Sequence, residues 1–163
     1  DFKFDDKRYL NPENDEIGLT VTVAAQGENK EGKDKKLNQI QYWLVPPQGQ
    51  GKELDKYNKD CKANDKKEIK CTITINNKLF DDIKLTDYQA GEYKINIEAH
   101  DDMGQRTEKE EEFTVRCGPG DGQQFNRVGK CEATSTCDRS IRINPQTVSC
   151  PEEKGLVCCG YWE

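Results

Sequence analysis

Histidine is nearly absent from this chain, since His100 is the only one in 163 residues. Serine is scarce as well and is confined to Ser135, Ser140 and Ser149, all close to the C-terminal cysteines. A Ser-His-Asp arrangement would have to bring one of them to His100. Neither G-x-S-x-G nor a phosphate-binding loop ending in Gly-Lys-Ser/Thr occurs. We therefore predict a protein that is not an enzyme and binds no cofactor, with His100 an ordinary residue at the end of a strand.

Long apolar runs are also missing. No stretch approaches the roughly 18 consecutive apolar residues that a transmembrane helix needs, so we expect no membrane span. Charged residues make up 34% of the chain, hydrophobic residues 33%, and the net charge is −6. Nucleic-acid binding needs a basic face, so we expect no nucleic-acid partner and interpret the charge as a solvated surface. No signal peptide is visible, and a start at Asp1 is typical of a processed, mature protein.

Cysteine, in contrast, is abundant, with eight residues in the chain. An even, clustered set of cysteines indicates disulfides formed in an oxidising compartment, so we expect a secreted or cell-surface protein. Structural zinc is the alternative, but the C-x2-C spacing is absent and histidine ligands are lacking. Cys61 and Cys71 flank a polar stretch, and a bridge between them would tether the long loop over residues 48–70.

Apolar residues alternate with polar ones throughout the first two-thirds of the chain. This period of two predicts half-buried strands, and no long window shows the helical period of 3.6. We expect six to eight short strands in about the first 116 residues, including one over residues 78–85, and an all-β antiparallel sandwich over residues 13–116. The residues expected on the inward faces are Leu19, Val21, Val23, Ala25, Ile40, Tyr42, Leu44, Cys71, Ile73, Ile75, Tyr93, Ile95, Ile97, Ala99, Phe113 and Val115.

The N-terminal segment, residues 1–12, is predicted to be extended. Phe2 and Phe4 alternate with charged residues, and Pro12 ends the segment. Such a strand either pairs within its own domain or adds to the sheet of another molecule. We favour internal pairing and keep Phe2 and Phe4 as candidate binding residues.

Residues 85–115 resemble the last strands of immunoglobulin-like domains. Asp87, Gly91 and Tyr93 fill a pattern similar to the corner that starts the penultimate strand of this family. The resemblance implies that the Tyr93 hydroxyl bonds back to the preceding turn, and that Trp43 is buried in the core. The inter-sheet cysteines of the family are missing, since Ile95 stands at the second position. Fibronectin type III and cadherin-like sandwiches fit almost as well.

Acidic pairs are the remaining candidates for a metal site. Asp81, Asp82, Asp87, Asp101 and Asp102 could gather at one end of the sandwich, and calcium is the cation that such loops bind. The EF-hand pattern is absent, and we interpret these residues as solvated loops. The prediction is that there is no metal site.

The C-terminal part, residues 117–163, resembles a clip domain, a small module with six cysteines of which the last two are adjacent. Gly129, two residues before the second cysteine, also matches. The resemblance implies the pairs Cys117–Cys158, Cys131–Cys150 and Cys137–Cys159, whereas sequence alone allows fifteen connectivities. Other cystine-rich modules also end in adjacent cysteines. Three bridges would stabilise a module too small to fold on an apolar core.

The function expected from these features is structural or adhesive. We predict the subunit of an extracellular filament or appendage, which associates with itself or with another extracellular protein. Tyr161 and Trp162 are candidate binding residues or a cap on the core of the module. One alternative is a module that regulates or inhibits proteases, in which a loop presents Arg139 or Arg142 to a trypsin-like enzyme. Another is carbohydrate binding through the two aromatic residues.

Overall fold

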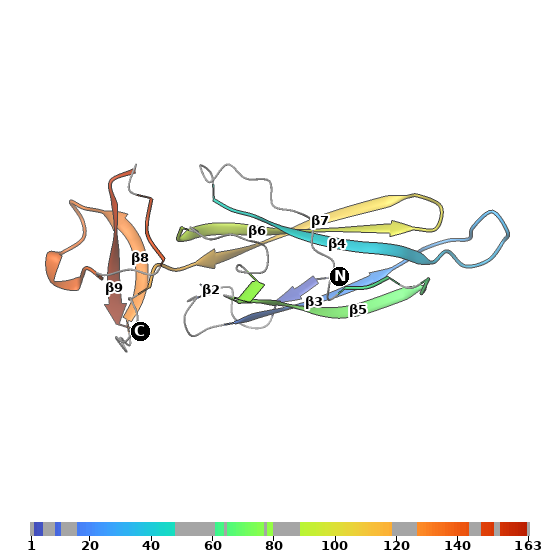
Figure 1. Cartoon of the computed structure of the whole chain (residues 1–163), viewed down its shortest axis with the longest axis horizontal. Coiled ribbons are helices and arrows are strands. Elements are labelled where there is room, and N and C mark those ends of the chain that lie inside the picture. The colour runs from blue at the N-terminus through green and yellow to red at the C-terminus, as the bar shows by residue number, and fades with distance from the viewer. Residues whose placement is uncertain are drawn as a thin grey trace.

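The computed structural model describes residues 2–4, 9–10, 16–47, 61–63, 65–76, 78–79, 89–118, 127–143, 148–151 and 154–162. Strands dominate the described residues, and one short 3₁₀ helix lies near the C-terminus (Figure 1). The elements are β1 Phe2–Phe4, β2 Tyr9–Leu10, β3 Ile17–Ala24, β4 Leu37–Val45, β5 Glu68–Ile75, β6 Gly91–Asp101, β7 Arg106–Val115, β8 Arg127–Ala133, η1 Arg139–Ile141 and β9 Leu156–Trp162. In the described part, no helix is long and apolar enough to cross a membrane.

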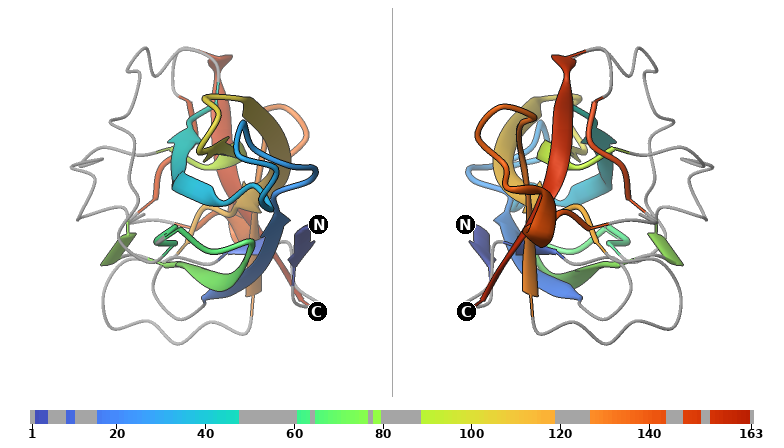
Figure 2. Two further views of the ribbon diagram at one scale, coloured as in Figure 1. Left: turned by 90° about the vertical axis from the view of Figure 1, so that its right-hand side faces the viewer. Right: turned by 90° about the vertical axis from the view of Figure 1, so that its left-hand side faces the viewer.

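Three sheets organise these strands. The first has the order β1-β3-β5, the second β2-β7-β6-β4, and the third pairs β8 with β9. All neighbours are antiparallel except β2 and β7, which run parallel. The first two sheets lie face to face, and the β8–β9 sheet stands at one end of the molecule (Figures 1 and 2).

The core lies between the two larger sheets, as the alternating pattern predicts. Inward residues of β3, β4, β6 and β7 are buried in one continuous cluster, and the intervening residues are more exposed, except for Glu98 on β6. Tyr93 is fully buried with its ring 5.7 Å from that of Phe113. The prediction of a chain built on antiparallel sheets with half-buried strands is therefore confirmed.

The N-terminal segment is divided between the two sheets. β1 pairs antiparallel with β3, with Phe2 opposite Val21 and Phe4 opposite Leu19. β2 instead pairs in parallel with the end of β7, at Thr114 and Val115. The segment is thus paired within its own chain, which is the arrangement that we favoured.

Two expectations need correction. Trp43 is not in the core: it is half-buried and alternates along β4 with the buried residues Tyr42 and Leu44. It therefore faces away from the other sheet, as the period of two requires. The strand expected over residues 78–85 is also wrong where it can be compared, because Lys78 and Leu79 are helical and the rest lies outside the described residues.

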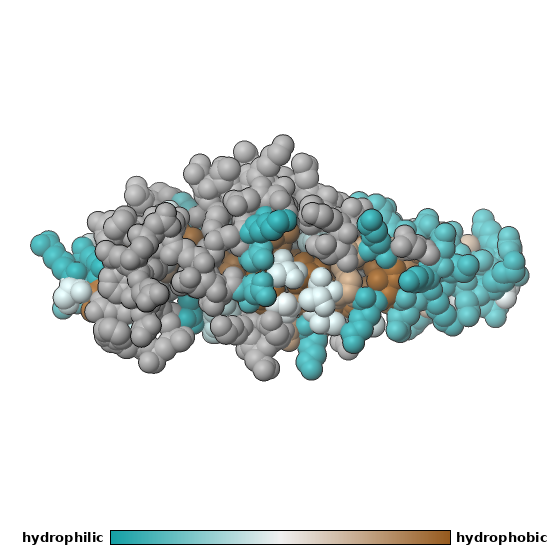
Figure 3. Space-filling view, turned by 60° about the horizontal axis from the view of Figure 1, so that its bottom comes forward, coloured by the Kyte–Doolittle hydropathy of each residue, from teal (hydrophilic) through white to brown (hydrophobic). Residues whose placement is uncertain are grey.

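The end of the molecule opposite the β8–β9 sheet is strongly polar. There the β3–β4 connection, residues 25–36, is mostly exposed and rich in Lys, Glu and Asp, which gives this end a hydrophilic surface (Figure 3). The Asn29 side chain accepts hydrogen bonds from the backbone N–H groups of Glu31 and Lys33, both at 3.0 Å. The connection is thus an ordered turn held by a side chain that suits turns.

Candidate functional site

Four disulfides are the dominant covalent feature of the chain. They join Cys61 to Cys71, Cys117 to Cys158, Cys131 to Cys150 and Cys137 to Cys159. The first pair is the one predicted to tether the loop over residues 48–70. The other three are the pairs that the resemblance to clip domains implies. The four bridges indicate an oxidising compartment.

The adjacent cysteines of β9 divide their bridges between two directions. Successive residues of a strand point to opposite faces, so the bridges of Cys158 and Cys159 leave β9 on opposite sides. Cys158 turns to Cys117, which follows the end of β7, and Cys159 turns to Cys137 in the loop after β8. One strand thereby fastens the module both to the sandwich and to its own loop.

Gly129 marks the place where β8 crosses the chain at Cys117. A Cβ atom built on Gly129 would lie 1.7 Å from the carbonyl oxygen of Cys117, far inside contact distance. Only glycine therefore allows β8 to approach this closely. The glycine noted in the sequence has a packing role that spacing alone does not show.

The module also contacts the turn that precedes β6. The backbone N–H of Ala90 donates to the carbonyl of Ser149 at 2.9 Å, and the hydroxyl of Tyr93 donates to the carbonyl of Gln89 at 2.8 Å. Val148 is buried in the same cluster as the sandwich core. The module and the large sheets are therefore joined by the Ala90–Ser149 backbone hydrogen bond and by packing as well as by Cys117.

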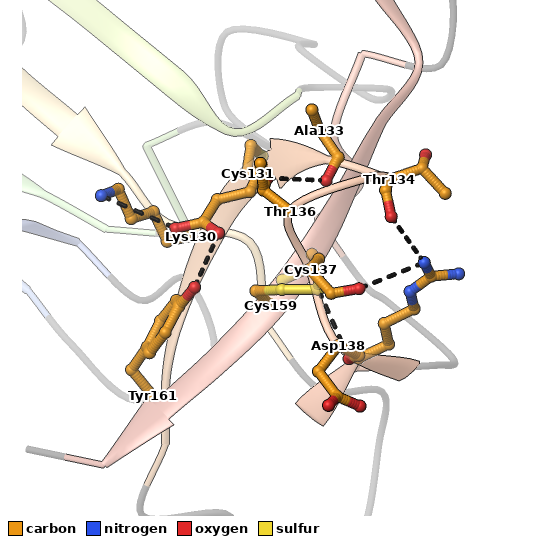
Figure 4. Close-up of a disulfide and its surroundings, with 12 residues drawn as sticks. Lys130, Cys131, Ala133, Thr134, Thr136, Cys137, Asp138, Cys159 and Tyr161 are labelled. Atoms are coloured by element: carbon orange, nitrogen blue, oxygen red, sulfur yellow. Dashed lines mark hydrogen bonds and ion pairs between the residues drawn. A yellow bond between two sulfur atoms is a disulfide. The ribbon is translucent and has the colours of Figure 1, made fainter. Parts of the chain in front are cut away.

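The loop between β8 and η1 is held from inside by Arg142. Its guanidinium donates to the carbonyl oxygens of Thr134 at 2.9 Å and Cys137 at 3.2 Å (Figure 4). Asp138 accepts from the backbone N–H of Ser140 at 2.8 Å and so caps the 3₁₀ turn. The backbone and side-chain hydrogen bonds from Ser140 hold the pKa of Asp138 below its usual range.

This geometry bears on the protease-inhibitor alternative. Arg142 is turned inward and used as a clamp, so it does not project toward an enzyme. Arg139 is exposed, but it lies in the helical turn η1 rather than in an extended loop. An extended, rigid loop is what docking into a protease cleft by this logic requires.

Tyr161 projects from β9 and is 39% exposed. Its hydroxyl donates to the Glu132 carboxylate at 2.6 Å, which lies across the β8–β9 pair (Figure 4). That hydrogen bond, with partial burial, raises the pKa of Tyr161 above its usual value. Its partner in the sequence prediction, Trp162, lies opposite Arg127 in the register. The Trp162 side chain lies outside the described residues.

His100 contacts a carboxylate that sequence reasoning missed. Its Nε2 lies 2.6 Å from the Glu98 carboxylate, which is 3% exposed and also lies 3.6 Å from Arg106. Glu98 faces away from the core on β6, between the inward residues Ile97 and Ala99, so alternation predicts it exposed. Because Ser149 contacts Ala90 at the other end of β6, about 30 Å of extended strand separates it from His100. The two residues do not form a catalytic pair.

The acidic pair at the end of β6 stabilises a turn. Asp101 accepts from the backbone N–H groups of Met103 and Gln105, both at 2.9 Å, and its other oxygen lies 3.6 Å from Lys35. Partial desolvation opposes ionisation, but these hydrogen bonds and Lys35 hold the pKa of Asp101 below its usual value. Asp102 accepts from the backbone N–H of Lys36. Asp81, Asp82 and Asp87 lie outside the described residues.

One group of sulfur atoms has a spacing that would suit a metal. The Sγ atoms of Cys117, Cys131 and Cys150 lie within 4.8 Å of one another. Each of them is bonded in a disulfide, and metal binding by cysteine requires the thiolate. The group therefore holds the module together and does not provide metal ligands in this state.

A groove opens between the two large sheets, beside the N-terminal strand. It has a volume of about 610 Å³ and combines apolar residues at its base with polar ones at its rim. Phe2 lies at its margin, with the Lys109 ammonium 4.9 Å from the ring centre. The residues that line it are Phe2, Thr22, Val23, Ala24, Ala25, Gln26, Leu37, Ile97, Ala99, Asp101, Gln105, Thr107 and Lys109.

Comparison of the chain with models of protein families, with curated proteins and with solved structures returned no match.

Proposed function

We propose that β1–β7 form an immunoglobulin-like sandwich. Two features support this. The N-terminal segment is shared between the sheets, antiparallel to β3 and then parallel to β7. The Tyr93 hydroxyl bonds to the carbonyl four residues earlier, as the corner tyrosine of that family does. Gly91 begins β6 with φ +149°, and a Cβ there would lie 2.9 Å from Pro47, which accounts for glycine in this corner.

We further propose that the chain is an extracellular, non-enzymatic structural or adhesive protein. In this account it is a subunit of a surface filament and associates with other copies through its sandwich and its N-terminal strand. The observation that carries this proposal is the groove beside β1, where the described strands leave the edges of two sheets incompletely paired. Strand edges of this kind are where extended segments of other molecules add.

The disulfide module fits the same function. Its three bridges close segments of 41, 19 and 22 residues, and each closure contributes about 3–4 kcal/mol by reducing the entropy of the unfolded chain. A subunit that works outside the cell is in an oxidising environment, where disulfides persist. The bridges add stability to a chain in which 34% of the residues are charged.

Sedimentation velocity of the native, non-reduced chain over a range of concentrations tests self-association. The proposal predicts that the weight-average mass rises above that of one 18.7 kDa chain as concentration increases. A single species of monomer mass at every concentration would contradict it. The same measurement after reduction is the control, because loss of the bridges should abolish ordered association.

A further inference from the structure

The groove arises from a mismatch in length between two neighbouring strands. β3 has eight residues, whereas β1 has three and its register reaches Leu19, Thr20 and Val21. β3 then continues through Val23 and Ala24, which pair with β5 on one side. Among the described residues, no strand pairs with these two on the side of β1, and both line the groove.

The opposite wall of the groove is a second strand edge. β7 pairs with β6 from Arg106 to Val115 but with β2 only at Thr114 and Val115. Thr107 and Lys109, which line the groove, precede that contact. The groove thus lies between one strand edge from each large sheet, next to β1, whose Phe2 is among its lining residues.

The base of the groove belongs to the core. Leu37, Ile97 and Ala99 are 8% exposed or less, yet all three line it. Small residues, Ala24 and Ala25, stand on the β3 side. Such a site combines an apolar base with the backbone N–H and C=O groups of a strand edge. It suits an extended segment that presents apolar side chains at every second position.

Charge decides which segment of a second copy fits. The edge of β7 carries four glutamates and one lysine over residues 108–112, so two β7 edges would repel each other. β1 carries Phe2 and Phe4 on one face with Lys3 between them. It pairs antiparallel with β3 in its own chain. Residues 1–8 carry three aspartates and three Lys or Arg residues, so β1 of a second copy suits the groove without bringing net negative charge to the acidic edge.

The side-chain period allows β1 to enter in the correct orientation. Phe2 and Phe4 lie opposite Val21 and Leu19 in the resident strand. An incoming β1 shifted by four residues would lie opposite Ala25 and Val23. Because a shift by an even number keeps the same face inward, both rings would still point to the core.

We propose that the groove is the docking site for β1 of a second copy, and that copies associate by passing β1 from each one to the next. This inference rests on the proposed self-association and names the segment and the surface that perform it. The incoming strand pairs first beside Val23 and Ala24 and then replaces the resident β1. Every copy both gives and receives a strand. The β1 of one copy therefore makes with β3 of the next the same contacts that the resident β1 makes.

The resident β1 is held weakly enough to be replaced. It has three residues in register with β3, and of its side chains only Phe4 is buried. β2, the next strand, is anchored on the other sheet through β7. β1 can therefore leave without separating β2 from its partner, and strand segments with few contacts open at low free energy.

A labelled synthetic peptide with the sequence of residues 1–8, titrated into the full native chain and followed by fluorescence anisotropy, tests the site. We expect saturable binding, and at least about tenfold weaker binding of a peptide with alanine at both phenylalanine positions, since each buried ring contributes that much. Lys109→Glu should weaken binding because it removes the cation over the ring and adds charge to an acidic edge. Lys62→Glu, the same change at an exposed lysine outside the groove lining, is the matched control.

A second variant fills the groove instead of changing its rim. Ala99→Leu places apolar atoms on the groove base and should reduce both peptide binding and the self-association seen by sedimentation, with a melting curve to show that the variant folds. Self-association that neither groove variants nor excess peptide reduce would overturn the exchange of β1 and leave the proposed function standing. Peptide binding by a chain that stays monomeric would support the docking site and overturn the filament. Absence of peptide binding would overturn the docking site in either case.

Discussion

The hydroxyl of Tyr93 offers a sharp test of how the sandwich and the module are joined. It donates a 2.8 Å hydrogen bond to the carbonyl of Gln89, next to Ala90, whose backbone N–H bonds to Ser149. Tyr93→Phe removes the hydroxyl that makes this bond and keeps the ring that stacks on Phe113. The perturbation therefore acts on the turn on which the module rests.

The magnitude follows from the burial of the two groups. A hydrogen bond of this kind contributes about 1 kcal/mol net, and a buried acceptor left without its donor adds to the loss. Tyr93 is fully buried but Gln89 is half-exposed, so water can reach the carbonyl. We expect the free energy of unfolding to fall by about 1–2 kcal/mol, which lowers the melting temperature by about 3–6 °C in a chain of this size.

Urea denaturation under non-reducing conditions, followed by circular dichroism, measures the change. Tyr161→Phe is the matched control, because it deletes a hydroxyl of the same kind from an exposed residue that bonds to Glu132. The control should shift the midpoint less than Tyr93→Phe does. An unchanged midpoint for Tyr93→Phe, or an equal shift for both variants, would refute the structural role given to this corner.

Three further changes test other parts of the structure. Gly129→Ala should destabilise the chain by about 3 kcal/mol or more, since its Cβ would overlap the carbonyl of Cys117, and a melting curve within a degree of the native one would contradict this. Replacing Cys131 and Cys150 together by serine should remove about 3 kcal/mol of stability in the same urea assay, because the bridge closes a segment of 19 residues. Asp101→Asn should be less stable than the native chain above about pH 4, and the difference should shrink as pH falls toward the lowered pKa of Asp101. A difference that does not vary between pH 7 and pH 3 would show that ionised Asp101 does not stabilise the turn.

The faces of the strands could be predicted from the sequence because burial on one side imposes a period of two. β3 and β6 read directly as alternating apolar and polar residues, and the inward set was identified for both. Turn residues and cysteine positions then limited where the chain could reverse and cross-link. Tyr93 was found as a core residue for the same reason.

Other features depend on relations between segments that are distant in the sequence. Trp43 was placed in the core by resemblance, although its position next to Tyr42 and Leu44 puts it on the other face. Glu98 is buried beside His100 because other groups cover the outer face of the sheet. The alternation of apolar and polar residues does not show such covering. The groove follows from β3 being longer than β1, and neither strand shows this alone.

Electron microscopy of negatively stained, native, non-reduced material shows whether the chain assembles into filaments, with reduced material as the control. We expect ordered fibres in the native sample, their loss on reduction, and their loss in the Lys109→Glu variant. Dispersed single particles in the native sample at high concentration would contradict the claim that this chain is a filament subunit.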